Sequence, residues 1–144
     1  MAVSMEPGER GASPPNSAVP TGEIYFSILK IGKCLFASVP PQLRDAHARA
    51  LQETIARRLA SETGIRGVLL DVSALGIVDS YAARVLEEVG STSKSLGARA
   101  ILVGLRPAVA ITLVELGIDL THVETAMSLE RALQVLRMRI VAED

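Results

Sequence analysis

The sequence predicts one α/β domain with a mixed, mostly parallel sheet, an antiparallel hairpin at its start and about four helices. Two observations support this fold class. Short apolar runs alternate with stretches whose apolar residues recur at helical spacing, which is the pattern of strand–helix units around a parallel sheet. Before them, a β-branched and aromatic run is followed by Gly32, Lys33 and a second apolar run, which predicts a hairpin with a tight turn.

Three strands are expected in the first half of the domain. Residues 24–31 and 34–39 are the two strands of the hairpin, and Pro40 and Pro41 end the second of them because proline cannot donate to a strand ladder. Residues 67–72 are almost entirely apolar, as expected of a central parallel strand that is covered on both faces.

A helix is expected to begin at Gln42, where the apolar spacing changes. Its apolar positions are four residues apart and therefore share one face. These positions are Leu43, His47, Leu51, Ile55 and Leu59. Gly64 is expected to cap the end of this helix.

Strand and helix alternate through the second half. A helix that ends near Gly97 has its apolar positions at Ala82, Val85, Leu86, Val89 and Leu96. Residues 100–103 form the next buried strand. Pro107 suits the first position of a helix over residues 108–116, which Gly117 is expected to cap.

The chain is expected to close with a short strand over residues 123–127 and a final helix that Ser128 caps. The apolar positions of that helix are Leu129, Ala132, Leu133, Leu136 and Ile140. Residues 23–144 would form the domain. Residues 1–22 are rich in Pro, Gly, Ser and Ala and lack apolar periodicity, which predicts a disordered tail.

Composition argues against several classes of protein. The 144 residues carry a formal net charge of -1, whereas a nucleic-acid binder would show a basic patch or a high pI. No apolar run approaches the roughly 20 residues that span a bilayer, and no secretory signal begins the chain. We therefore expect a cytoplasmic protein that binds neither nucleic acid nor membrane. Cys34, in an apolar run, is expected to be a buried small hydrophobe.

Few residues could support catalysis. His47 lies on the apolar face of the first helix, where a packing role is expected, and His122 has no nearby Cys or second His. The sequence contains neither phosphate-binding glycine motif nor a nucleophile elbow. We predict no enzyme activity, no catalytic residue, no metal site and no cofactor.

The most informative stretch is residues 71–83, where a buried strand, a short loop and an amphipathic helix follow one another. Asp79 is a good N-cap and places Ser80 in the first helical turn. These two residues either serve only to cap the helix or form a phosphorylation site. A phosphate on Ser80 would add about -1.5 to -2 charge near the positive end of the helix dipole and change what docks there.

Residues 70–73 and 77–80 resemble the phosphoacceptor region of STAS domains, the anti-sigma-factor antagonists. Residues 103–118 are similar to the small single-domain antagonist of the bacterial stressosome, the RsbS type, and residues 93–98 add to this likeness. The similarity runs from about residue 24 to residue 136. A large residue after the serine, here Tyr81, is closer to the stressosome type than to the Asp-Ser-Ser-Gly of many sporulation antagonists.

The resemblance implies a STAS fold and a partner switch. It implies that a serine/threonine kinase of the switch type phosphorylates Ser80, with Thr112 as a weaker second site, and that Asp79 and Tyr81 belong to the switch surface. The unphosphorylated protein would sequester the kinase, and phosphorylation would release it to a downstream regulator. The implied partners are that kinase, a larger STAS sensor paralogue, a phosphatase and further copies of the chain in homo- and hetero-oligomers.

Three alternatives remain open on the residues alone. A receiver-like domain would use Asp71 as phosphoacceptor, although the acidic pair and the lysine that such a site needs are missing. A nucleotide-binding domain on a similar sheet is the second. The third is a purely structural subunit in which Ser80 is never modified.

Overall fold

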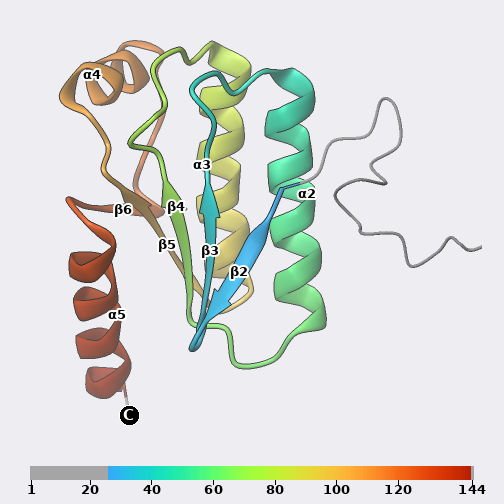
Figure 1. Cartoon of the computed structure of the whole chain (residues 1–144), viewed down its shortest axis with the longest axis vertical. Coiled ribbons are helices and arrows are strands. Elements are labelled where there is room, and N and C mark those ends of the chain that lie inside the picture. Colours follow the sequence, from blue (N-terminus) through green and yellow to red (C-terminus); the bar gives the residue numbers. More distant parts are fainter. Residues whose placement is uncertain (1–25, 144) are drawn as a thin grey trace, which may run out of the picture.

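A computed structural model of the chain describes residues 26–143 and contains one five-stranded sheet, in the order β2-β3-β4-β5-β6 (Figure 1). The strands are β2 (Ile28–Ile31), β3 (Cys34–Ser38), β4 (Gly67–Asp71), β5 (Arg99–Val103) and β6 (Val123–Ala126). The helices are α2 (Asp45–Ser61), α3 (Ser80–Ser95), α4 (Pro107–Glu115) and α5 (Leu129–Glu143). The predicted tail, residues 1–22, lies outside the described residues.

The expected element order and the mixed sheet are confirmed. β2 and β3 pair antiparallel across the turn at Gly32 and Lys33, and Gly32 has the positive φ of 58° that such a turn requires. The pairs β3–β4, β4–β5 and β5–β6 are all parallel. The strands β3 to β6 therefore end at the same edge of the sheet, which is also the end of the molecule at which α4 lies (Figure 1).

The helices form two layers around the sheet. α2 and α3 pack side by side on one face, and α5 contacts β4, β5 and β6 on the other (Figure 1). Both β–α–β connections through α2 and α3 step in the same direction across the sheet, so crossovers of one hand place both helices on the same face. The predicted apolar face of the first helix is buried at Leu43, Leu51, Ile55 and Leu59.

The prediction that the first helix begins at Gln42 is wrong, because α2 begins at Asp45. The segment before it is held by the loop that precedes α3. The carbonyl oxygen of Pro41 accepts hydrogen bonds from the backbone N–H groups of Gly76 and Ile77, at 3.0 and 3.3 Å. Gln42 pairs with Ile77 as an isolated bridge and so has extended backbone.

The ends of α2 and α3 also differ from expectation. The residue that caps α2 is Glu62, whose N–H bonds to the Arg58 carbonyl, while Gly64 lies two residues further on with a φ of 80°. Leu96 was expected on the buried face of the next helix. It follows the last residue of α3 and is 47% exposed, because the chain turns there towards the left-handed Gly97.

Other expected boundaries are confirmed or change by a few residues. Pro107 is the first residue of α4, and Gly117 follows its C-cap with a φ of 76°. Ser128 caps the last helix, since its Oγ accepts a hydrogen bond from the Arg131 N–H at 3.1 Å. The expected strand over residues 24–31 begins only at Ile28, and its first two residues lie outside the described part. The side chain of Ile140 also lies outside that part.

Candidate functional site

The loop from β4 to α3 ends at Asp79, which caps α3 as predicted. Asp79 has extended backbone, and its Oδ1 accepts a hydrogen bond from the Ala82 N–H at 2.8 Å. Its carbonyl oxygen accepts the first helical bond, from the Ala83 N–H at 2.9 Å. An aspartate in this position satisfies N–H groups that have no partner within the helix, which fixes where α3 begins.

Ser80 is the first residue of α3 and is exposed. Its hydroxyl therefore lies on the surface at the amino end of a helix of 16 residues. The N–H groups of the first turn and the helix dipole make this position electropositive, so an anionic group is tolerated there. A kinase could reach this hydroxyl without local unfolding.

The neighbouring surface combines apolar and charged residues. Ile77 is 63% exposed although it is a large aliphatic side chain. With Asp79, Gln42, Leu43 and Arg44 it lines a hollow of about 250 Å³ between the start of α2 and the start of α3. The region around Ser80 thus offers a partner an apolar contact beside groups of both charges.

The start of the same loop is held by Asp71, at the end of β4. Its Oδ1 accepts hydrogen bonds from the Ser73 N–H at 3.0 Å and from the Ser73 hydroxyl at 2.7 Å. The backbone N–H of Val72 bonds to the carbonyl of Val103 on the adjacent strand at 2.9 Å. The Asp71 carboxylate therefore serves the turn of its own loop.

Tyr81 and Thr112, the other predicted site residues, make structural contacts. Tyr81 is half-buried against the core, and its hydroxyl accepts a long hydrogen bond of 3.5 Å from Arg49 Nε, an interaction that raises the pKa of Arg49. Thr112 is half-buried in α4, and its hydroxyl donates to the Ala108 carbonyl at 3.0 Å. Ser80 alone among the predicted phosphoacceptors has an exposed side chain.

Among residues 26–143, no group of three or more His, Cys, Asp or Glu side chains is placed to hold a metal ion. His47 packs edge-on against Phe26, with ring centroids 6.4 Å apart, as the packing interpretation expected. His122 is exposed in the turn before β6, and Cys34 is buried. In the same part of the chain no helix is both long and apolar enough to cross a bilayer.

Sequence reasoning missed the contribution of Gln42, Arg44 and Ile77 to the surface beside Ser80. The predicted helix begins at Gln42 and includes Arg44, and Ile77 is one apolar residue of the predicted loop. No local signal locates them, because Pro40-Pro41 restricts only the residue before each proline, and Gln42 is extended through its bridge to Ile77, which lies far along the sequence.

Comparison with known proteins identifies relatives over most of the domain. Residues 21–132 match the STAS domain family. The chain is 35% identical to YezB of Bacillus subtilis (strain 168) over 83 residues, which is 58% of this chain and 85% of YezB. It is 37% identical over 90 residues to the RsbT co-antagonist protein RsbRD of the same organism, which is 62% of this chain but only 32% of RsbRD.

Two solved structures are similar in both fold and sequence. One is RsbS of Moorella thermoacetica, in a variant with a serine replaced by glutamate. It shares 33% identity and a TM-score of 0.71, covering 80% of this chain and 97% of RsbS. The other is a chain from a structure of the stressosome, a signal integration and transduction hub. It shares 34% identity and a TM-score of 0.69, covering 79% of this chain and 98% of that chain.

The two solved structures have the predicted fold, and their chains match over almost their whole lengths. The resemblance to the small single-domain stressosome subunit of the RsbS type is thereby confirmed. The chain belongs to the STAS-domain family.

Proposed function

We propose that this chain is a non-enzymatic scaffold and antagonist of a bacterial stressosome that phosphorylation controls. The unphosphorylated form sequesters a serine kinase of the switch type, and phosphorylation of Ser80 releases that kinase to a downstream regulator. The observation that carries the proposal is the exposed Ser80 at the first position of α3, directly after the cap formed by Asp79.

The local electrostatics suit a switch that leaves the fold intact. A phosphate on Ser80 adds about -1.5 to -2 charge beside the positive end of the helix dipole, which favours it. Arg84, exposed one turn further along α3, is at the spacing that lets opposite charges pair on a helix. Asp79 opposes the new charge. These effects partly cancel, so α3 is expected to remain folded when Ser80 is modified.

The partner surface, in contrast, changes strongly. A kinase that docks on Ile77 and the adjacent hollow covers an apolar side chain three residues before Ser80. If the partner stayed bound, the phosphate on Ser80 would lose part of its hydration shell at the margin of that contact. This desolvation is costly unless the partner supplies a cation to pair with the phosphate. Release follows from the charge and does not require a rearrangement of the sheet.

The proposed partners follow from the relatives and from a second exposed surface. RsbRD, an RsbT co-antagonist of which the matched residues are 32%, supports a larger STAS paralogue among the partners. The switch kinase is the partner that the resemblance implies. The outer face of α4 exposes Ile111 at 58% and Val114 at 68%, which suits contact with another STAS domain in a homo- or hetero-oligomer. A phosphatase would reset the switch, and the assembly would lie in the cytoplasm.

The decisive experiment is phosphorylation of the full chain with ATP and the cognate switch kinase, followed by mass spectrometric mapping. We expect the main phosphate on Ser80 and its loss in Ser80→Ala, with Thr112 as the weaker second site. Ser95→Ala, which changes an exposed serine at the other end of α3, is the control and should be modified like the wild type. Modification elsewhere with Ser80 untouched contradicts the site, and no modification at all favours a purely structural subunit.

A further inference from the structure

The amino ends of α2 and α3 lie next to each other, at the end of the molecule that carries Ser80 (Figure 1). Gln42 and Ile77, which precede the two helices, pair as parallel chains. Two residues further along each chain lie Arg44 and Asp79, the N-cap residues of α2 and α3, and both have extended backbone. The parallel register therefore places Arg44 opposite Asp79, and both residues line the same hollow.

This register brings the Arg44 side chain within reach of a phosphate on Ser80. Neighbouring extended chains lie about 4.8 Å apart and consecutive Cα atoms about 3.8 Å apart, so roughly 9 Å separates the Cα atoms of Arg44 and Ser80 along this path. An extended arginine and a phosphoserine together span that distance. Both residues are exposed, so their side chains can turn towards each other without disturbing the core.

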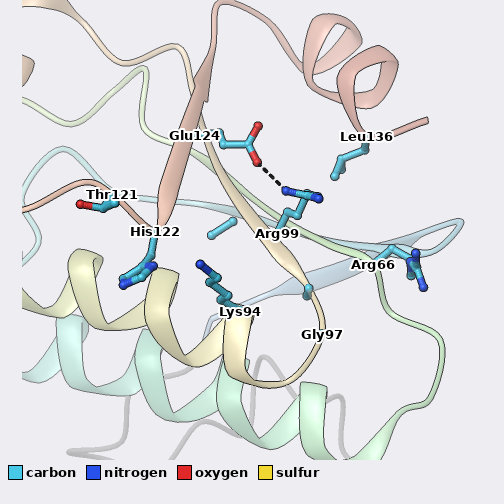
Figure 2. Close-up of a pocket in the computed structure, with 10 residues that line it drawn as sticks. Arg66, Lys94, Gly97, Arg99, Thr121, His122, Glu124 and Leu136 are labelled. Carbon is cyan, nitrogen blue, oxygen red and sulfur yellow. Dashed lines mark ion pairs between the residues drawn. The ribbon is translucent and has the colours of Figure 1, made fainter. Parts of the chain in front are cut away.

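The guanidinium of Arg44 is held in position by a neutral group. Its Nε and Nη2 donate hydrogen bonds to Oε1 of Gln42, at 3.1 and 2.8 Å. Within residues 26–143, Arg44 forms no ion pair. Arg99, in contrast, is paired with Glu124 at the far end of the sheet (Figure 2). The charge at the start of α2 is therefore oriented without being paired.

Two carboxylates of this region interact with other groups. Asp79 accepts a hydrogen bond from the Ala82 N–H through Oδ1, which holds it at the start of α3. Asp45 acts on Arg49, whose pKa is raised first by the Tyr81 hydroxyl and also by Asp45. A phosphate offers about twice the charge of either carboxylate and three acceptor oxygens, so it would compete well for the guanidinium that lines the hollow.

We propose that Arg44 receives the phosphate of Ser80 within the same chain, an inference that rests on the proposed phosphorylation of Ser80. The guanidinium exchanges the neutral Gln42 oxygen for a dianion, with which it forms shorter and stronger hydrogen bonds. Its planar fork of N–H groups fits two phosphate oxygens at once. Arg84, four residues along α3, adds the weaker attraction of an i,i+4 pair.

The exchange changes the shape of the partner surface as well as its charge. Arg44 lines the hollow of about 250 Å³ beside Ile77, and its guanidinium leaves the Gln42 side of this hollow when it turns to Ser80. A partner side chain that occupies the hollow in the unphosphorylated state would then lose its place. Arg44 thereby couples the modification of Ser80 to the apolar contact at Ile77.

The test uses the full chain with phosphoserine incorporated at position 80 during translation, and ³¹P NMR follows the second ionisation of the phosphate near pH 6. A nearby cation favours the dianion, so Arg44→Met should raise the pKa of the phosphoserine by about 0.5 relative to the wild type. Arg44→Lys, which keeps the charge without the fork, should restore part of the difference. Arg57→Met removes an exposed arginine far along α2 and should titrate like the wild type.

A second measurement follows the hydrogen bonds that Arg44 gives up. In the wild type, phosphorylation should shift the side-chain amide resonances of Gln42, because the guanidinium leaves its Oε1. In Arg44→Met these resonances should be nearly the same with and without the phosphate. Resonances of Gln42 that stay unchanged in the phosphorylated wild type overturn the proposal.

The proposal is also overturned if Arg44→Met and Arg57→Met give the same phosphoserine pKa, or if Arg84→Met alone raises it. These outcomes are distinct from a failure of the proposed function. The phosphate is introduced without a kinase, so a kinase that does not modify Ser80 is detected only by the mass spectrometric mapping. The absence of the contact with Arg44 is detected only by the titration.

Discussion

The guanidinium of Arg106 donates a hydrogen bond from Nη2 to the carbonyl oxygen of Leu75 at 2.6 Å. Arg106 is the N-cap residue of α4, and Leu75 lies in the loop that leads to Ser80. The same nitrogen would lie 3.1 Å from a Cβ on Gly76, so the side chain packs directly over this loop. The helix that carries Thr112 and the loop before Ser80 are thus joined by one side chain.

Arg106→Met should loosen the loop before Ser80. The substitution keeps most of the aliphatic stem but leaves the Leu75 carbonyl without its charged donor, a loss of about 1–2 kcal/mol. Hydrogen exchange should become faster at the amides of residues 75–77, and the free energy of unfolding in urea should fall. Arg57→Met, on the exposed side of α2, is the control. Unchanged exchange in the Arg106 variant would show that the Pro41 contacts alone hold this loop.

Asp79→Ala should destabilise the protein by about 1 kcal/mol, because the Ala82 N–H loses its acceptor at the start of α3. Asp79→Asn retains a side-chain oxygen that can accept the same hydrogen bond. Its free energy of unfolding should therefore fall by only a few tenths of the loss in Asp79→Ala, mainly because the negative charge near the helix dipole is missing. Urea denaturation of the three proteins measures both effects. Equal losses in the two variants would assign the stabilisation to charge and not to the hydrogen bond.

Substitution of Ser80 tests the partner switch. Ser80→Ala should keep the fold and retain the kinase even in the presence of ATP. Ser80→Asp should release it only in part, since one carboxylate carries less charge and fewer acceptor oxygens than phosphate. Retention is measured by size-exclusion chromatography of the chain with the kinase. Equal retention by both variants counts against control by charge at this position.

Gly90→Ala should destabilise the protein, which is the opposite of the usual result for glycine within a helix. Alanine in an ordinary helical position is favoured by about 1 kcal/mol. Here the added Cβ meets the His122 backbone and Val123, so overpacking of about 1–3 kcal/mol is expected. Ser95→Ala, at an exposed position of α3, should not lower the free energy of unfolding. If the Gly90→Ala protein were more stable than the wild type, the start of β6 would be able to move away from the new Cβ at little cost in free energy.

The buried thiol of Cys34 should make stability fall at alkaline pH. Burial raises the pKa of Cys34, so the folded protein favours the protonated thiol. The resulting stabilisation is complete below the unfolded pKa of about 8.5 and is lost as pH rises towards the folded value. Denaturation between pH 7 and 10 should show a decline that Cys34→Ala reduces. A thiol reagent should modify Cys34 only after unfolding.

Much of the fold could be predicted because its signals are local. Alternating apolar runs define the strands, and single residues such as Asp79, Pro107 and Ser128 mark helix starts through hydrogen bonds or a missing N–H within their own turn. The start of α2 could not be predicted in this way. It depends on the Pro41 carbonyl, whose two donors lie in a loop far along the sequence.

The candidate site could likewise be predicted only where its signals are local. The position of Ser80 at a helix start follows from the capping residue beside it, whereas the hollow next to it is formed by the segments that precede α2 and α3, which only the folded domain brings together. The close approach of α3 to the start of β6 at Gly90 could not be predicted either, because a glycine within a helix does not indicate which strand packs against it.

Strand order has a consequence for biosynthesis. Along the sheet each strand lies next to the strands that precede and follow it in the sequence, from β2 to β6. As the chain leaves the ribosome, each new strand can therefore pair with an edge that already exists, and no strand must wait for a later one to separate it from its neighbour. Because α5 packs on β4, β5 and β6 and follows all three along the chain, it closes the second layer over strands that are already paired.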